Sequence, residues 1–84
     1  MTINNGNTGV NVGVDVGKFQ LDIFIWERDR HFTVENTEDG IREAIKILNR
    51  YRIDRIAMEA TGRYEMAFAA AAFERDLPVT FPQS

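Results

Sequence analysis

A carboxylate inside a strictly alternating apolar stretch is the residue of this sequence best placed to do chemistry. Asp15 lies between Gly13 and Gly17, which share its orientation if the stretch is extended. An ionised carboxylate within a strand is costly unless a partner compensates it. Two interpretations fit the spacing equally. The glycines leave room for a metal ion and a phosphate to approach Asp15, or Asp15 ends its strand by accepting turn hydrogen bonds from Gly17 and Lys18.

Glu59 is the second candidate, because it ends an apolar stretch in which Ile56 and Met58 have the opposite orientation. If its strand lies parallel to and beside the first, Asp15 and Glu59 come within about 5 Å of each other at the end of the sheet where ligands gather. Two such carboxylates repel unless one is protonated or a cation lies between them. Oxygen ligands of this kind suit Mg²⁺ or Mn²⁺. The alternative is an acid that caps the following helix or pairs with Arg63.

Alternation predicts the strands that must hold these carboxylates. Residues 10–17 alternate strictly, with valines on one face, and 19–26 and 31–35 follow as the other strands of an antiparallel meander. In the second strand Phe19 shares the apolar face of Leu21. Phe24 and Trp26 lie on the opposite face, where we expect a helix to cover them because both faces of the sheet need cover.

Two helices are predicted between and after these strands. Residues 36–39 begin the first helix with a capping side chain and acids in the first turn, and its apolar stripe reaches Tyr51. A fourth strand at 55–59 leads into an alanine-rich helix from about Arg63 to Arg75, and residues 77–81 form a short edge strand between prolines. The resulting order, β-β-β-α-β-α-β, predicts an α/β fold with a mixed sheet and right-handed crossovers.

Composition limits the class of protein. Eighty-four residues make one small domain at most; we expect 1–9 to be a flexible lead and 10–84 to form the domain. No apolar run approaches the roughly 20 residues of a membrane span. We expect no signal peptide, and the absence of cysteine makes a cytoplasmic location the default. The ending just after a strand, without a closing helix, predicts a truncated domain.

Charge narrows the function further. Ten basic and 13 acidic side chains give a net charge of −3. That balance counts against a free-standing DNA-binding module, which needs a basic surface. It does not count against a catalytic domain whose carboxylates hold a divalent metal, because the metal inverts the local charge.

Two stretches of the sequence carry a resemblance to a known family. Val12–Lys18 and Met58–Glu65 resemble the N-terminal domain of Piv-like transposases, the DEDD-type transposases of bacterial insertion sequences, related to pilin-gene-inverting recombinases. Glu35, Asn36 and Thr37 with Gly40 also fit the pattern of the family ahead of its first helix. The similarity runs from about Val10 to Phe81. Thr80-Phe81-Pro82 departs from the Val-Asn-Pro expected there, which affects only the path of the chain beyond.

The resemblance implies a ribonuclease-H-like fold with an active site similar to that of RuvC Holliday-junction resolvase. The first acid of the family falls on Asp15 and its second on Glu59, while the last two lie beyond Ser84, as does a C-terminal domain. It implies two-metal-ion cutting and rejoining of DNA at transposon ends and target, a homo-oligomer and, in some members, a guide RNA. With two of four carboxylates, we expect this chain to bind Mg²⁺ or Mn²⁺ weakly or not at all and to be inactive.

Other residues near the carboxylates leave alternatives open. Lys18 could contact a phosphate or be an ordinary turn lysine. Arg63, at the start of the second helix where anions bind readily, could touch the DNA backbone or be a surface arginine. Asp22 could support Asp15 from the neighbouring strand or be a solvated acid of the hairpin.

Two other functions compete with a transposase. An actin-like or sugar-kinase-like ATP-binding domain opens with a similar strand but usually has Thr or Ser after the second glycine, where this chain has Lys18. A non-catalytic interaction module on the same fold predicts instead that Asp15 and Glu59 are dispensable.

Overall fold

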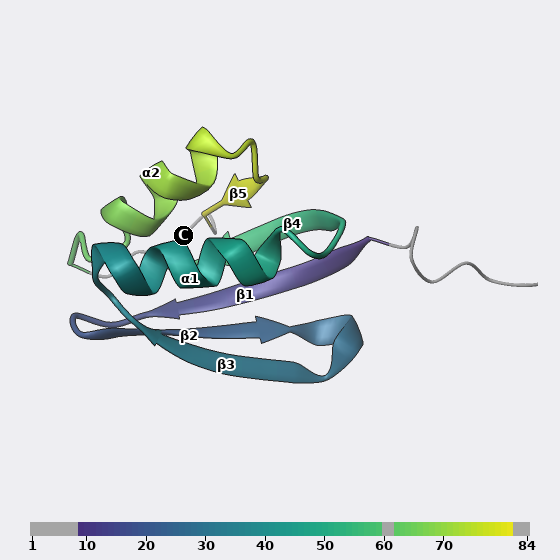
Figure 1. Ribbon diagram of the computed structural model, residues 1–84, viewed down its shortest axis with the longest axis horizontal. Helices are drawn as coiled ribbons and strands as arrows, with labels where there is room; N and C mark the ends of the chain where they lie inside the picture. Colours follow the sequence, from purple (N-terminus) through teal and green to yellow (C-terminus); the bar gives the residue numbers. More distant parts are fainter. Residues whose placement is uncertain (1–8, 60–61, 82–84) are drawn as a thin grey trace, which may run out of the picture.

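Five strands form one mixed sheet in the computed structural model, which describes residues 9–59 and 62–81 (Figure 1). The strand order is β3-β2-β1-β4-β5. The strands are β1 (Val10–Val16), β2 (Gln20–Ile25), β3 (Arg30–Glu35), β4 (Ile53–Met58) and β5 (Val79–Thr80), with a 3-10 turn, η2 (Trp26–Arg28), between β2 and β3. The predicted order of elements, the meander and the edge position of the last strand are confirmed. The predicted lead at 1–9 lies, apart from Gly9, outside the described residues.

The sheet combines two kinds of pairing. β2 is antiparallel to both β1 and β3, whereas β4 is parallel to both β1 and β5. The predicted parallel pairing of the first and fourth strands is therefore confirmed. It brings together the two strands on which the carboxylates were predicted.

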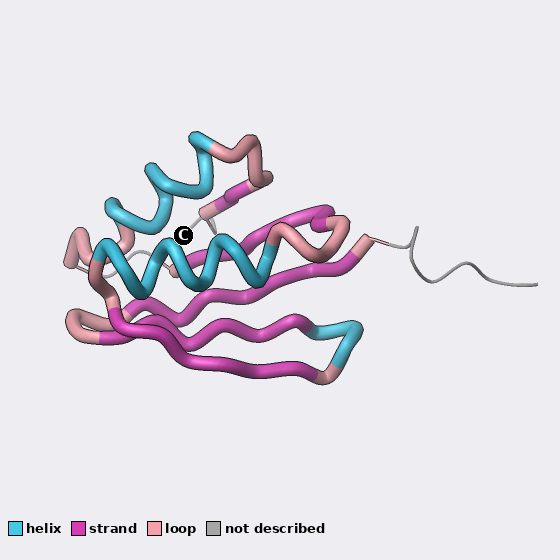
Figure 2. The backbone as a smooth tube through the Cα atoms, in the orientation of Figure 1, coloured by secondary structure: helices cyan, strands magenta, loops and turns pink. Residues whose placement is uncertain are grey.

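Both helices, α1 (Glu38–Leu48) and α2 (Met66–Glu74), lie on the same face of the sheet (Figure 2). Their crossovers run from β3 to β4 and from β4 to β5, which is the same direction across the sheet. Because such crossovers are right-handed, both helices must fall on one side. Neither helix of the described residues is long and apolar enough to cross a membrane.

The core lies between these helices and the sheet. The apolar stripe of α1 is buried at every predicted position inside the helix, and the buried side chains of α2 centre on the fully buried Phe68. They pack on the alternate valines of β1 and on the apolar residues of β2 and β4. The members of this core from the sheet and from α1 are Val10, Val12, Val14, Val16, Leu21, Ile23, Ile25, Ile56, Met58, Ile41, Ala44, Ile45 and Leu48.

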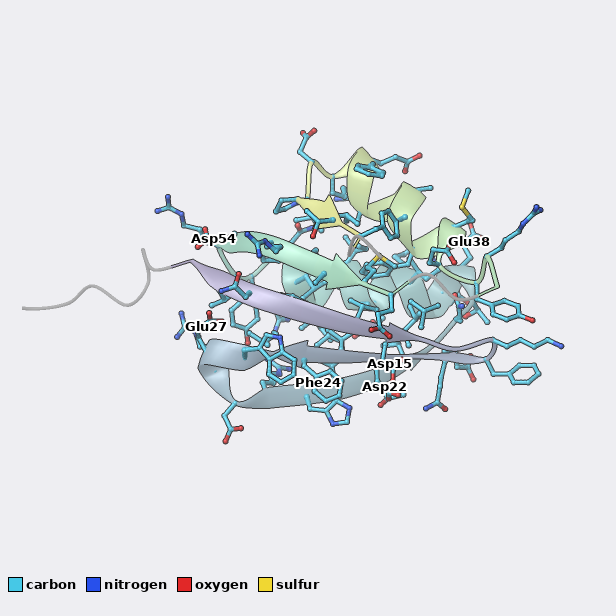
Figure 3. All side chains as sticks on the ribbon, turned by 180° about the vertical axis from the view of Figure 1, so that it is seen from behind. Asp15, Asp22, Phe24, Glu27, Glu38 and Asp54 are labelled. Atoms are coloured by element: carbon cyan, nitrogen blue, oxygen red, sulfur yellow. The ribbon has the colours of Figure 1, made fainter. Side chains whose placement is uncertain are left out.

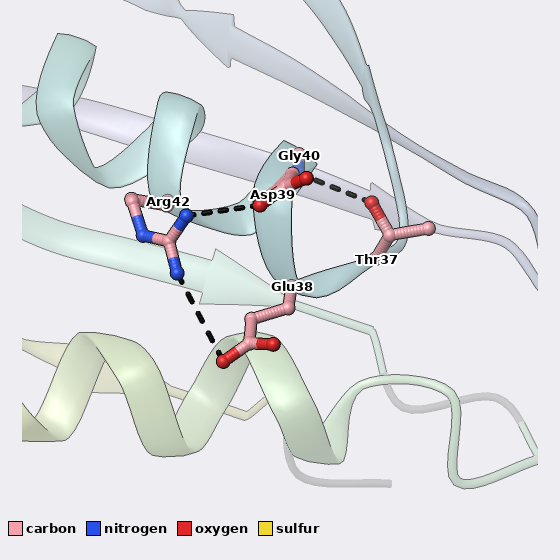
Figure 4. Close-up of polar contacts among 5 residues, drawn as sticks. All are labelled: Thr37, Glu38, Asp39, Gly40 and Arg42. Carbon is pink, nitrogen blue, oxygen red and sulfur yellow. Dashed lines mark hydrogen bonds and ion pairs between the residues drawn. The ribbon is translucent and has the colours of Figure 1, made fainter.

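The start of α1 is fixed by a local cap, as the sequence predicts. Thr37 is extended, and its Oγ1 accepts a hydrogen bond of 3.1 Å from the Gly40 N–H (Figure 4). Arg42 reaches back to both acids of the first turn, 2.9 Å from Asp39 and 3.9 Å from Glu38. The cap and the acids satisfy free N–H groups and oppose the helix dipole.

Three local predictions are wrong. The second helix begins at Met66 rather than about Arg63, because Gly62 and Arg63 adopt left-handed conformations with φ of 66° and 73°. The first helix ends at Leu48, so Tyr51 lies in the loop that follows it. Phe19 belongs to the β1–β2 turn rather than to the core, and 76% of its surface is exposed.

The expectation that a helix covers Phe24 and Trp26 is also wrong. Over residues 9–59 and 62–81, the second face of the sheet has no helix on it, and Trp26 is 62% exposed. Its ring stacks on Phe24 at 5.3 Å, and Phe24 stacks on His31 at 4.3 Å. The reason is the shared direction of the two crossovers, which leaves this face open. We call it the open face: the face that carries Asp15, Asp22, Phe24 and Trp26.

Candidate functional site

The two predicted carboxylates follow neighbouring parallel strands at the same end of the sheet. Val14 of β1 is paired in register with Met58 of β4, and both side chains are buried under the helices. Asp15 and Glu59 are the next residues along these parallel strands, and both are exposed. Alternation within β1 turns Asp15 to the open face. Glu59 directly follows the last residue of β4, a strand whose backbone lies about 5 Å from that of β1. Figure 3 looks onto this face and shows Asp15 near the end of β1.

Lys18 and Arg63 lie in turns at this same end of the sheet. Lys18 is exposed in the β1–β2 turn, with its ammonium group 5.2 Å from the centre of the Phe19 ring. Arg63 is exposed in the turn between β4 and α2. The fold therefore gathers all four predicted site residues at the carboxyl ends of β1 and β4, where parallel sheets bind ligands.

Each of the two glycines beside Asp15 has a close neighbour within the chain itself. A Cβ added to Gly13 would lie 3.2 Å from the Trp26 indole, so this side chain occupies the space beside Gly13. A Cβ on Gly17 would meet the Gln20 carbonyl oxygen at 3.2 Å, across the tight β1–β2 turn. The glycines alone therefore do not argue for a metal, and that prediction depends on the carboxylate pair.

Asp22 lies directly opposite Asp15 in the antiparallel ladder, but its carboxylate is engaged from the other side. It accepts a hydrogen bond of 2.6 Å from the Thr33 hydroxyl and lies 3.7 Å from His31 Nε2. The Thr33 hydrogen bond, with smaller contributions from Gln20 and His31, holds the pKa of Asp22 below its ordinary value. These contacts connect β2 to β3 and favour the interpretation of Asp22 as an acid of the hairpin.

The donor set at this end suits a hard cation but is incomplete. Asp15 and Glu59 offer carboxylate oxygens, the ligands that Mg²⁺ and Mn²⁺ prefer. Among residues 9–59 and 62–81, however, no three Asp, Glu, His or Cys side chains converge as a metal-binding group. Two protein carboxylates match the usual share of ligands for Mg²⁺, which keeps several waters. Asp15 and Glu59 could therefore supply some of the ligands of a Mg²⁺ or Mn²⁺ site.

Two residues at this end were not selected from the sequence. The sequence marks Asn36 as part of a helix start and of the family pattern ahead of the first helix, yet its side chain donates to two backbone carbonyls, those of Gly17 and Tyr64. Glu65, just before α2, is 8% exposed, and its Oε1 is buried with no hydrogen-bond partner in the described residues. Glu65 lies two residues beyond the left-handed Arg63, and its burial depends on long-range packing that no local pattern reveals.

A large groove of the described residues lies away from the two carboxylates. A groove of about 930 Å³ runs between α1 and α2, on the opposite side of the sheet from Asp15. Small side chains of α2, among them Ala67 and Ala70, form one wall, and Arg42 and Lys46 of α1 lie on the other. The groove results from alanines facing a helix with long polar side chains. Neither predicted carboxylate lines it.

Comparison with known proteins supports the fold. No protein-family model matches the sequence, and no curated protein sequence matches it. A solved structure that does match is T. thermophilus RuvC in complex with a Holliday junction substrate, with a TM-score of 0.65 and 17% identity. The alignment covers 89% of this chain and 64% of the RuvC chain. The fold is ribonuclease-H-like. At this identity the likeness concerns the fold, and the chain spans about 64% of the length of its structural neighbour.

Proposed function

We propose that this chain is the N-terminal part of the catalytic domain of a Piv-like DEDD transposase, which cuts and rejoins DNA with Mg²⁺ or Mn²⁺. The observation that supports the proposal is the parallel register of β1 and β4, in which Val14 pairs with Met58, so that Asp15 and Glu59 each follow directly on one member of this pair. The motif resemblance gives these positions their roles. The likeness to RuvC, solved with a DNA junction, is compatible with DNA as the partner.

In this proposal Asp15 and Glu59 bind the divalent ions. Such ions, when bound, supply activation of the attacking oxygen and stabilisation of the leaving oxygen. Lys18 and Arg63 contact DNA phosphates from the two turns that flank the carboxylates. The two remaining carboxylates follow Ser84 in the parent enzyme, which acts as a homo-oligomer in the cytoplasm, in some members with a guide RNA. This chain alone binds the metal weakly and is inactive.

A titration with Mn²⁺ followed by NMR tests the metal site in this chain. We expect paramagnetic broadening centred on the amides of Asp15 and Glu59. Glu59→Gln should weaken the apparent affinity by at least about tenfold, because ligand charge sets the affinity of such sites. Glu43→Gln makes the same change on an exposed helix position and should leave the affinity unchanged. Broadening centred on the acidic first turn of α1, or none at millimolar Mn²⁺, would refute the site.

A second experiment tests the reaction. In a longer chain that carries the remaining carboxylates, Asp15→Ala and Glu59→Ala should each abolish DNA cleavage and rejoining. Undiminished recombination would favour the non-catalytic interaction module. ATP binding that is indifferent to DNA would favour the kinase-like alternative.

A further inference from the structure

Asn36 connects three segments that are distant in sequence. It lies between β3 and α1, but Thr37 rather than Asn36 caps the helix. The Asn36 backbone N–H donates to the Phe19 carbonyl at 2.9 Å. Its side-chain Nδ2 donates to the Gly17 carbonyl at 2.9 Å and to the Tyr64 carbonyl at 3.0 Å.

The acceptors of these bonds lie in the two turns that follow the carboxylate-bearing strands. Gly17 is two residues beyond Asp15, and Tyr64 is five residues beyond Glu59. An asparagine amide carries two N–H donors on one nitrogen, and here each one reaches a different turn. A single planar group therefore fixes the distance between the β1–β2 turn and the β4–α2 turn.

The chemistry of this bridge requires an amide. An aspartate at position 36 would have the same shape but no N–H donor, and two carbonyl oxygens would face its charge. An alanine would leave both carbonyls to water, and each lost bond is individually modest in stability. Loss of the bridge should therefore change the relative position of the two turns more than it changes the stability of the fold.

We propose that Asn36 is a positioning residue for the Asp15–Glu59 pair: its amide holds the ends of β1 and β4 at the separation at which both carboxylates bind one divalent ion. The inference rests on the proposed function, because it presupposes that this pair binds metal. Groups that orient metal ligands without touching the metal change metal affinity by roughly 10- to 100-fold when they are removed.

The test compares Asn36→Ala and Asn36→Asp with Asn49→Ala, a control at the exposed C-cap of α1. Two quantities are measured: amide hydrogen exchange without metal, and the Mn²⁺ affinity at a temperature where all variants are folded. Asn36→Ala should speed exchange in the turns at 17–19 and 62–65 and weaken Mn²⁺ binding by at least about tenfold. Asn49→Ala should change neither quantity.

Asn36→Asp separates geometry from charge. Its added negative charge would by itself attract a cation, whereas the loss of both donors opens the bridge. We expect weaker Mn²⁺ binding than in the unmodified chain. Equal or tighter binding by Asn36→Asp, or unchanged binding by Asn36→Ala, would overturn the positioning role.

The same measurements distinguish a failure of the metal site from a failure of the Asn36 bridge. If the unmodified chain binds no Mn²⁺ at Asp15, the metal site is refuted and the positioning role is refuted with it. The exchange measurement still decides whether the bridge exists. Unchanged exchange in Asn36→Ala would refute the bridge even where the metal binds as proposed.

Discussion

Replacing Gly40 by alanine is a sharp test of how α1 meets the sheet. Gly40 lies in the first turn of α1, against the end of β3 (Figure 4). A Cβ at this position would lie 2.0 Å from the Glu35 carbonyl oxygen, 2.8 Å from its carbon and 3.0 Å from its nitrogen. All three are backbone atoms, so no side-chain rotation relieves the contact.

The expected effect has the opposite sign to helix propensity. Propensity alone favours alanine over glycine by about 1 kcal/mol. Ordinary contact begins at 3.4 Å, so the start of α1 and the end of β3 must separate by 1.4 Å, the difference between 3.4 and 2.0 Å. Overpacking of this kind costs about 1–3 kcal/mol and occasionally more. The shift also strains the Thr37 cap bond, which is worth about 1 kcal/mol. We expect a net loss of about 2 kcal/mol.

Thermal unfolding followed by circular dichroism measures this loss. For a domain of this size, 2 kcal/mol corresponds to a fall in Tm of roughly 8–16 °C. Gly13→Ala is the matched control: the three atoms nearest its Cβ, at 3.2 to 3.4 Å, all belong to the Trp26 ring, and that exposed side chain can move aside. The control should change stability by less than about 0.5 kcal/mol. A Gly40→Ala variant as stable as the unmodified chain would refute the close approach of α1 to β3.

Three further predictions concern the core and the acids. Phe68→Ala, at a fully buried position, should cost about 3–5 kcal/mol in urea unfolding; a loss below about 1 kcal/mol would contradict the packing of α2. Thr33→Val removes the main cause of the lowered Asp22 pKa. A carboxyl group whose pKa is lowered by folding stabilises the fold at pH values above its unfolded-state pKa, and this stabilisation is lost as the pH falls through its folded-state pKa. The difference in stability between the unmodified chain and Thr33→Val should therefore shrink toward acid pH. A difference that stays constant with pH would contradict this role of Thr33. The Glu27 carboxylate accepts hydrogen bonds from the backbone N and the side-chain Nδ2 of Asn11, both at 2.7 Å, and these bonds lower its pKa. In an NMR titration, Asn11→Ala should raise the pKa of Glu27 partway toward its ordinary value. An unchanged pKa would contradict the contact.

Local patterns in the sequence predict most of the scaffold. The valine alternation of β1 and the stripe of α1 are each set by a period that the backbone imposes, so the buried residues of both elements follow from the sequence. The prediction for Phe19 fails because a turn ends the alternation before β2 begins. The start of α2 is misplaced because Arg63 adopts a left-handed conformation, which a non-glycine residue takes up rarely.

The candidate site is predicted only in part, because its geometry is non-local. The types of Asp15 and Glu59 and their places at strand ends are visible in the sequence, and the parallel pairing follows from the order of elements. The explanation of Gly13 is not visible, because it depends on an indole that comes from η2 and folds back over β1. The lack of a helix on the open face, over residues 9–59 and 62–81, is likewise not visible in any one segment, since it depends on the direction of both crossovers together.

The sequence by itself determines the strands, the apolar stripe of α1 and the positions of the two carboxylates at strand ends, because each is encoded in residues that are neighbours along the chain. Only the tertiary structure decides that both helices share one face and that Asp22 is engaged by Thr33. It also decides that the amide of Asn36 connects carbonyls 19 and 28 residues away. The physical reason is the same in each case: such contacts depend on how whole elements pack, and the local conformational preferences of a segment do not specify that packing.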